Sequence, residues 1–224
     1  MLRFLIVVVL VLSQPVYAAV PPDCETIAEQ TAQKYGIPRG VMAAISRVEA
    51  GYKWSDGRHR AWPWTANFAG ESAYYKTHDE LVEQVEAAIL DGKENIDLGC
   101  MQINLRWHGD HFSTLAQMAD PAKNVDYAAR FLLDLYDQFG TWQQAIGAYH
   151  SRDPARSQDY AAKVLAVYNR RTHTAPVQGV QKLAQTTANQ RTDRAPSAAF
   201  SDTYAPNIRP SGIPKMPKTR GVIN

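Results

Sequence analysis

Apolar residues recur every three or four positions between Val41 and Val48, which is the spacing of one face of an α-helix. Pro38 is expected in the first turn of this helix, because its fixed φ suits that position. Gly51 is expected to end the helix. The pattern therefore predicts a helix with a buried apolar face, and it places Glu49 in the last turn at the edge of that face.

Five further helices are predicted from the same periodicity together with residues that cap helix ends. Asp, Thr and Ser are strong N-caps because their side-chain oxygen accepts a hydrogen bond from the first turn, and Gly suits the left-handed residue after the last turn. Phe139 is expected on the buried face of the longest helix. The expected helices are 24–35 after Asp23, 78–90 after Thr77, 121–139 after Asp120, 142–149 after Thr141 and 158–171 after Ser157.

Residues 53–76 interrupt the helical pattern. Aromatic and β-forming residues from Trp62 to Phe68 and from Ala73 to Tyr75 flank a short turn, which predicts a two-stranded hairpin. The segment from Leu98 to Asn104 mixes apolar and polar residues and is interpreted as a short helix or turn. Together these elements predict an α+β fold that is predominantly α, with a small β-hairpin.

Residues 1–18 have the composition of a secretory signal peptide. Arg3 precedes an apolar run from Phe4 to Leu12, and the small residue Ala18 precedes the expected cleavage point. The apolar run is too short to span a bilayer comfortably, so no stable membrane anchor is expected. The mature protein is therefore expected to be exported.

Charge divides the rest of the chain at Arg171. Residues 19–171 contain 16 Lys and Arg against 20 Asp and Glu, a net charge of −4, whereas residues 172–224 contain 7 against 2, a net charge of +5. The second part also holds six prolines and few large apolar residues, so it is predicted to be a disordered basic tail. The first part is long enough for one domain with a hydrophobic core. A basic tail on an exported chain favours an anionic wall polymer or a protein partner over nucleic acid.

Glu49 is the candidate for acid–base chemistry. A carboxylate at the edge of an apolar helix face is partly removed from water, which raises its pKa and keeps it protonated near neutral pH. A general acid requires this property. The alternative from this segment alone is a surface Glu near a helix end, because Glu is seldom fully buried.

Three short segments then favour the acid. They are Arg47-Val-Glu49-Ala-Gly-Tyr52, Gly99-Cys-Met-Gln102-Ile-Asn104 and Ala145-Ile-Gly-Ala-Tyr149-His150. Over roughly residues 24–170 the chain resembles the lytic transglycosylases with a soluble-transglycosylase catalytic domain, a branch of the goose-lysozyme-like fold. In this resemblance Glu49 matches the catalytic Glu, Met101-Gln102 match a Met-Gln pair, and Ala148-Tyr149 match an Ala-Tyr pair. Tyr160 is placed like a later Tyr of the family.

Three positions depart from the family pattern. The family Ser after the Glu is Ala50 here, a Leu is replaced by Cys100, and the Asn after the Tyr is His150. Trp62-Pro-Trp-Thr and the second segment are similar to those of alphaproteobacterial, flagellum-associated members. This resemblance implies a periplasmic location and a flagellar rod or other secretion-machine protein as a partner of the tail.

Cys24 and Cys100 are the two cysteines of the chain. In an oxidising compartment a disulfide between them would close a loop of roughly 77 residues and stabilise the fold by about 4 kcal/mol in the chain-entropy model. Two free buried thiols are the alternative. The disulfide is favoured because Cys100 adjoins a motif that has to be held in place.

The family resemblance implies a peptidoglycan lytic transglycosylase with no cofactor and no metal. Protonated Glu49 would donate to the oxygen between N-acetylmuramic acid and N-acetylglucosamine, and its conjugate base would then direct the muramoyl C6 hydroxyl onto C1, which forms a 1,6-anhydro end. Ordinary glycosidases use two carboxylates. Asp97 is the nearest candidate for a second one and is interpreted as a structural turn or loop residue. A hydrolytic muramidase and a non-catalytic wall-binding scaffold are the alternatives.

Sugar-holding residues are expected around Glu49. Aromatic rings are expected to stack on pyranose rings, and side-chain amides to bind acetamido groups. By analogy with the family, Tyr149 is expected to hydrogen-bond Glu49. The expected substrate-binding residues are Tyr52, Trp64, Asn67, Met101, Gln102, Asn104, Tyr149, His150 and Tyr160.

Several other aromatic and histidine residues are interpreted as structural. Trp107, Trp142 and Tyr127 are expected in the core. His108 and His111 lie three residues apart without an evident third ligand, so they are expected to be loop residues rather than metal ligands.

Overall fold

The computed structural model describes residues 20–172. The predicted signal peptide lies outside these residues, as does the predicted tail beyond Thr172. Most of the described chain is helical. The helices are α1 Cys24–Tyr35, α2 Val41–Ala50, α3 His78–Leu90, α4 Leu105–His108, α5 Leu115–Ala119, α6 Pro121–Phe139, α7 Trp142–His150 and α8 Pro154–Thr172, with a 3₁₀ turn at Gly109–His111.

Six short strands form two antiparallel sheets. The strands are β1 Gly51–Lys53, β2 His59–Ala61, β3 Thr65–Phe68, β4 Glu71–Tyr74, β5 Ile96–Leu98 and β6 Ile103–Asn104. Strands β1 and β2 pair only with each other, whereas the larger sheet has the order β4-β3-β5-β6. The predicted hairpin is present as β3 and β4, and two later strands extend it.

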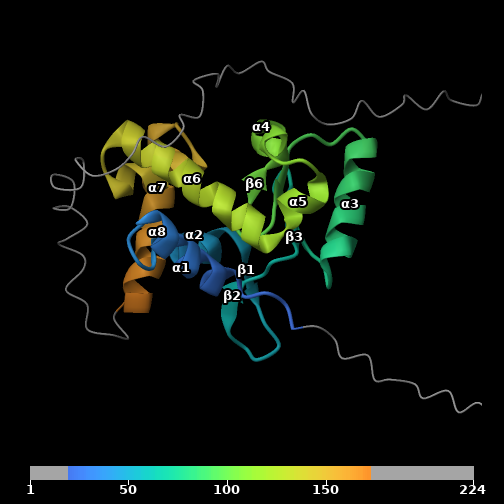
Figure 1. The fold of residues 1–224 in the computed structure, drawn as a ribbon, viewed down its shortest axis with the longest axis horizontal. Helices are drawn as coiled ribbons and strands as arrows, with labels where there is room; N and C mark the ends of the chain where they lie inside the picture. The colour runs from blue at the N-terminus through green and yellow to red at the C-terminus, as the bar shows by residue number, and fades with distance from the viewer. Residues whose placement is uncertain (1–19, 173–224) are drawn as a thin grey trace, which may run out of the picture.

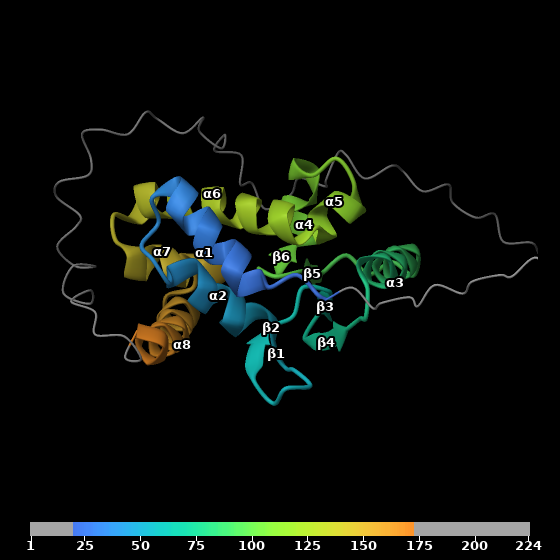
Figure 2. The ribbon, with the colours of Figure 1, turned by 60° about the horizontal axis from the view of Figure 1, so that its bottom comes forward.

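The elements gather into two halves that α6 joins (Figure 1). Helices α1, α2, α7 and α8 lie together at one end of α6, and the four-stranded sheet with α3, α4 and α5 lies at the other. Figure 2 shows the same division from a second direction, with the β1–β2 hairpin projecting beside the end of α2. Since α2 ends at the junction of the two halves, Glu49 lies where helical and sheet segments meet.

Most predicted helix ends are confirmed by their hydrogen bonds. Asp23 accepts from the backbone N–H groups of Glu25 and Thr26, and Asp120 accepts from that of Lys123. Two predicted helix starts are wrong. Gly40, not Pro38, precedes α2, because the chain turns between Pro38 and Val41 before the helix begins.

The predicted start of α8 is also displaced. Ser157 lies inside the first turns of α8, and Asp153 takes the capping role by accepting from the Arg156 N–H. The helix therefore begins at Pro154, where proline suits the first helical position.

Three further expectations are corrected by the structure. Leu98 to Asn104 is a strand end, a turn and a strand rather than a helix. Phe139 and Trp107 are exposed, with 36% and 37% of their surface accessible, because each lies at the end of its helix beyond the packed face. Trp142 and Tyr127 are buried as expected. Within residues 20–172, no helix combines the length and apolar character needed to cross a membrane.

Candidate active site

Glu49 lies in the last turn of α2, at the edge of the buried face that the sequence predicts. Val41, Ala44 and Ile45 on that face are almost wholly inaccessible to water. Glu49 itself is partly exposed, and its carboxylate accepts a short hydrogen bond from the Tyr160 hydroxyl of α8. The helix therefore anchors the backbone in the core and presents the carboxyl group where a ligand can reach it.

The surroundings of Glu49 keep its carboxyl group protonated near neutral pH. Burial raises its pKa to about 7, and this is the largest effect. The Tyr160 hydrogen bond opposes the rise by stabilising the ionised form, while the negative charge of Asp97 adds to it. A carboxyl group with such a pKa can donate a proton at neutral pH and accept one afterwards.

Helices α7 and α8 bring their aromatic residues to Glu49 because they approach each other closely at Gly147. A Cβ at Gly147 would lie 2.3 Å from Ser157 Oγ and 2.7 Å from the Ser157 carbonyl oxygen, so the approach requires glycine. Tyr149 and Tyr160 then both lie within the electrostatic influence of Glu49: burial raises the pKa of each hydroxyl most, and the negative charge of Glu49 raises it further. The packing of these two helices therefore builds one wall of the site.

The residue that donates to Glu49 differs from the expectation. Tyr160 makes this hydrogen bond, whereas the Tyr149 hydroxyl donates to the Met101 carbonyl oxygen at 2.9 Å. A phenol has one proton to donate, so Tyr149 is committed to the turn that contains Met101. The two tyrosines thus have different partners: Tyr160 contacts the acid and Tyr149 contacts the neighbouring turn.

The turn Gly99–Gln102 is held by hydrogen bonds to side chains of α2, α6 and, through Tyr149, α7. Ser46 of α2 donates to the Cys100 carbonyl oxygen at 2.9 Å, and the fully buried Asn124 of α6 accepts from the Met101 N–H at 2.9 Å. Asn124 also donates to the carbonyl oxygens of Leu98 and Met118, at 3.0 Å each. Because these groups are buried, each lost contact would leave an unpaired polar atom and cost about 1–3 kcal/mol.

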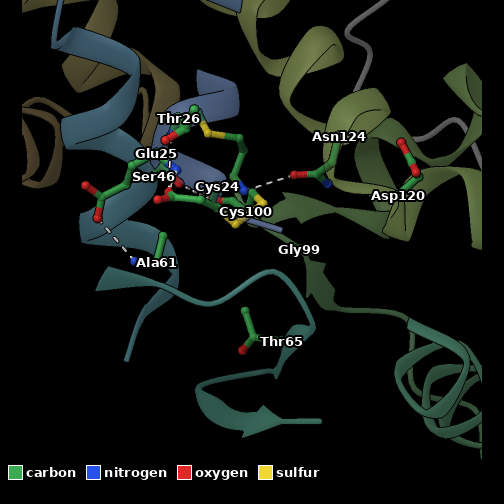
Figure 3. The surroundings of a disulfide bond; sticks show 12 residues. Cys24, Glu25, Thr26, Ser46, Ala61, Thr65, Gly99, Cys100, Asp120 and Asn124 are labelled. Atoms are coloured by element: carbon green, nitrogen blue, oxygen red, sulfur yellow. Dashed lines mark hydrogen bonds between the residues drawn. A yellow bond between two sulfur atoms is a disulfide. The ribbon is translucent and has the colours of Figure 1, made fainter. Parts of the chain in front are cut away.

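A disulfide fixes the same turn to the start of α1 (Figure 3). Cys24 and Cys100 are bonded with a Cα–Cα distance of 5.5 Å, which confirms the predicted pairing. Figure 3 shows Ser46 and Asn124 reaching the turn from either side of the disulfide. The disulfide, the serine hydroxyl and the asparagine amide therefore anchor a turn that also receives the Tyr149 hydroxyl.

This turn also carries backbone strain. Gln102 has a φ of +45°, a left-handed conformation that costs a non-glycine residue about 1–3 kcal/mol. Its side-chain amide donates to the Gly99 carbonyl oxygen at 3.0 Å and to that of Thr65 at 3.5 Å. The expected binding of substrate by the Gln102 N–H₂ group would have to replace these contacts, so the amide holds the turn in this structure.

Asp97 enters the site from the larger sheet. It lies in strand β5, not in the turn or loop that was expected, and its carboxylate accepts from Asn104 Nδ2 at 2.8 Å. Burial raises the pKa of Asp97, while the Asn104 hydrogen bond and His150 lower it. Asn104 Nδ2 also donates to Asn95 Oδ1 at 2.8 Å, so both of its amide protons are used within the protein.

Asn67 is placed directly opposite Asp97 across the β3–β5 pair. Its side chain closes the β3–β4 turn, since Nδ2 donates to Ser72 Oγ at 3.1 Å and Oδ1 accepts from the Gly70 N–H at 2.7 Å. The expected acetamido contact of Asn67 therefore competes with a turn-forming role.

The candidate stacking residues form an aromatic cluster just after Glu49. Tyr52 packs against Tyr74 and Trp62, with ring centroids 4.6 and 5.5 Å apart, and Trp62 packs edge-on against Trp64 at 5.9 Å. Tyr52 and Tyr74 are exposed, whereas Trp64 is partly buried against the core. The cluster joins the β1–β2 hairpin to the larger sheet, and its exposed members are Tyr52 and Tyr74.

Sequence reasoning missed Ser46 and Asn124, although both carry a weak signal. Each is a polar residue in an apolar stripe of a predicted helix, which is unusual unless its hydrogen bonds are satisfied. Ser46 lies one turn before Ala50 on the same side of α2. The helix thus lacks the family hydroxyl at position 50 and uses one at position 46 to contact the neighbouring turn.

His108 and His111 pack among aromatic residues. His108 Nδ1 lies 2.7 Å from the Tyr127 hydroxyl, and burial lowers the His108 pKa to about 4. His111 packs against the Tyr127 ring with centroids 5.2 Å apart. Over residues 20–172, no group of three or more His, Cys, Asp or Glu side chains is arranged to hold a metal ion.

The fold and the site together define a class of protein. A mostly helical domain with a small antiparallel sheet, and a protonated carboxyl group at a helix end, is the arrangement of lysozyme-like enzymes. The family model described as the transglycosylase SLT domain matches residues 26–163. The chain therefore belongs to this family, and it is a peptidoglycan lytic transglycosylase. No curated protein and no solved structure matches the chain.

Proposed function

We propose that this enzyme cleaves the β-1,4 bond between N-acetylmuramic acid and N-acetylglucosamine and leaves 1,6-anhydromuramic acid ends. Glu49 is the single acid and base of the reaction. The observation that carries this proposal is the raised pKa of Glu49, about 7, in a site where a tyrosine hydroxyl rather than a cation contacts the carboxylate. The peptidoglycan substrate itself follows from the family.

The reaction needs two proton transfers, both through the carboxyl group of Glu49. Protonated Glu49 donates to the glycosidic oxygen, the bond from that oxygen to muramoyl C1 breaks, and N-acetylglucosamine leaves with a free hydroxyl. The Glu49 carboxylate then removes the proton from the muramoyl C6 hydroxyl, whose oxygen bonds to C1. Glu49 ends protonated, so no water is consumed and the next cycle can begin.

The Tyr160 hydroxyl supports the second half of this cycle, and burial and Asp97 support the first. It stabilises the carboxylate formed after the first proton transfer, while burial and the charge of Asp97 favour the protonated form before it. The balance places the pKa near the operating pH, which is where one group serves best as acid and then as base.

Hydrolysis is a second candidate because Asp97 lies close enough for its charge to raise the pKa of Glu49. A second carboxylate near the acid is what a water-using glycosidase requires. The hydrogen bond from Asn104 argues for a supporting role, since it occupies one Asp97 carboxylate oxygen that a water-activating base would need free to accept.

Mass spectrometry of digested peptidoglycan distinguishes the two reactions. Wild-type enzyme is expected to release anhydro ends, which are lighter by one water than reducing muramic acid ends. The Glu49→Gln variant is expected to release neither product. Reducing muramic acid ends from the wild type would instead identify a muramidase, and the Asp97→Asn variant would then be expected to lose that activity.

The same proposal places the enzyme in the periplasm, exported by residues 1–18. Residues 172–224, with their net charge of +5, dock it to an envelope-spanning machine such as the flagellar rod, so that cleavage opens the wall locally. The change in composition at Arg171 and the resemblance of the motifs to flagellum-associated members support this assignment.

A deletion tests the docking step separately from catalysis. Removing 172–224 is expected to leave cleavage of isolated wall unchanged and to abolish localisation and capture of rod proteins. A tail of the same length with its seven Lys and Arg replaced by Gln is the matched control for charge. Unchanged localisation and capture after the deletion would exclude docking through the tail.

A further inference from the structure

The ring of His150 lies flat on the ring of Tyr160. The two ring centroids are 4.6 Å apart and the ring planes differ by 6°, a stacked pair. His150 is the last residue of α7, and Tyr160 lies in the following helix, α8. Tyr160 is buried, with 5% of its surface accessible, whereas His150 is exposed, so the imidazole covers a phenol that faces the site.

The stacked phenol is the one that contacts the acid. The Tyr160 hydroxyl donates to Glu49 Oε1. The O–H bond of a phenol prefers the ring plane, so rotation about the second side-chain torsion changes its direction, and a ring packed flat on the phenol face restricts that rotation. The imidazole is therefore placed to hold the donor in line with the carboxylate.

The charged groups that face His150 come from two elements. Lys163 and Arg156 of α8 lower its pKa, as does burial, whereas Asp97 of β5 raises it. The pKa of His150 is lowered on balance, so the ring is neutral at neutral pH. A neutral ring stacks on Tyr160 without placing a positive charge beside Glu49, where such a charge would favour ionisation of the acid.

We propose that His150 is a positioning residue for the acid: its ring holds the Tyr160 phenol in the orientation from which the hydroxyl donates to Glu49. This inference rests on the proposed role of Glu49. It gives a physical reason for an aromatic ring at position 150, where the family has Asn. A ring covers the phenol face, whereas the smaller amide group does not.

Two substitutions separate stacking from other roles of His150. His150→Ala removes the ring, whereas His150→Phe keeps a flat ring of similar size without a titrating nitrogen. Gln143→Ala, an exposed change on the same helix, is the matched control. Steady-state rates on purified glycan strands, measured from pH 5 to pH 9, give kcat and KM for each variant. They also give the alkaline limb, which is the fall of kcat at high pH as Glu49 ionises.

The His150→Ala variant is expected to lose about threefold in kcat with little change in KM, the effect of weakening one hydrogen bond to the acid without removing its donor. Its alkaline limb is expected to move to higher pH, because the Tyr160 hydrogen bond lowers the pKa of Glu49. His150→Phe is expected to recover most of the kcat that His150→Ala loses, and Gln143→Ala is expected to match the wild type. An unchanged His150→Ala, a loss confined to KM, or a His150→Phe as slow as His150→Ala would overturn the proposal.

A readout without turnover keeps this test apart from that of the proposed function. Carbon-13 NMR of enzyme labelled at glutamate carboxyl groups reports the titration of Glu49 directly. Its midpoint is expected to rise in His150→Ala and to stay in place in His150→Phe. A shifted midpoint combined with an active Glu49→Gln variant would refute the proposed function and leave the positioning contact intact. An unshifted midpoint would refute the positioning contact alone.

Discussion

Glu25 and Glu49 lie on neighbouring helices, α1 and α2, and their surroundings are opposite in charge. Glu25 is buried and accepts hydrogen bonds from Arg47, from Arg171 and from the Ala61 N–H. Glu49 accepts from the Tyr160 hydroxyl and, among residues 20–172, forms no ion pair. Its nearest charged influence is the negative Asp97.

The difference shows how one residue type becomes structural in one place and chemical in another. Arg47 is two residues from Glu49 in the chain, but residues two apart on a helix do not face each other. Arg47 instead binds Glu25 in a two-pronged ion pair, with N–O distances of 2.8 and 2.6 Å. Helix α2 thus turns its cation toward the structural carboxylate and away from the acid.

The largest expected effect separates the two residues by activity. Glu49→Gln is expected to lower kcat by about 10²–10⁴-fold, because the reaction loses both its acid and its base. Glu25→Gln is expected to retain wild-type kcat at 20 °C, since its contacts join α1, α2, β2 and α8 without touching the site. Rates of soluble product release from purified wall give the comparison, and comparable losses in two folded variants would contradict it.

Stability is expected to show the reverse order. Glu25→Gln leaves two guanidinium groups without their carboxylate and is expected to cost about 3 kcal/mol, the low end for breaking a buried pair because both Arg side chains reach solvent. Glu49→Gln breaks no ion pair and is expected to be at least as stable as the wild type. Urea unfolding at pH 7 measures both, and equal stability of wild type and Glu25→Gln would remove the structural role.

The difference in stability between Glu49→Gln and the wild type is expected to depend on pH. The pKa of Glu49 is raised from 4.5 to about 7 on folding, so the protonated form contributes stability that is complete below pH 4.5 and is lost as pH rises to about 7. Glutamine does not titrate, so the variant gains on the wild type across this window by about 2–3 kcal/mol. Urea midpoints at pH 4.5 and pH 8 test this, and a constant difference would exclude the raised pKa.

The sequence was sufficient for most of the helices because they depend on local patterns, whereas the choice of Glu49 as the acid needed the three motif segments together. The apolar spacing from Val41 to Val48 and the caps at Asp23 and Asp120 act within a few residues, and the structure has all three helices, with only the start of α2 displaced from its predicted position. The raised pKa of Glu49 followed from its place at the edge of the apolar face, and burial is indeed its largest cause. The predicted disulfide is also confirmed, because the two cysteines of the chain allow only one intramolecular pairing.

The remaining features depend on contacts between distant segments. Strands β5 and β6 are three and two residues long, too short for a periodic signal. Strand β5 forms because β3 offers an edge for pairing, and β6 then pairs with β5. The choice of Tyr160 over Tyr149 as donor depends on the approach of α7 to α8 at Gly147, which no local pattern encodes. The polar hydrogen bonds of Asn67 and Asn104 within the sheet were hidden for the same reason.

The smallest expected effect concerns the Tyr160 hydroxyl, which contacts Glu49 where an arginine contacts Glu25. Tyr160→Phe keeps the ring and its stacking on His150 but removes the donor, which is expected to lower kcat about three- to tenfold. Because the Tyr160 hydrogen bond lowers the pKa of Glu49, its loss is expected to move the alkaline limb of kcat to higher pH. Tyr149→Phe is the matched control, since the Tyr149 hydroxyl donates to Met101, and it is expected to leave the limb in place. A limb that moves in Tyr149→Phe and not in Tyr160→Phe would reverse the assignment of the two tyrosines.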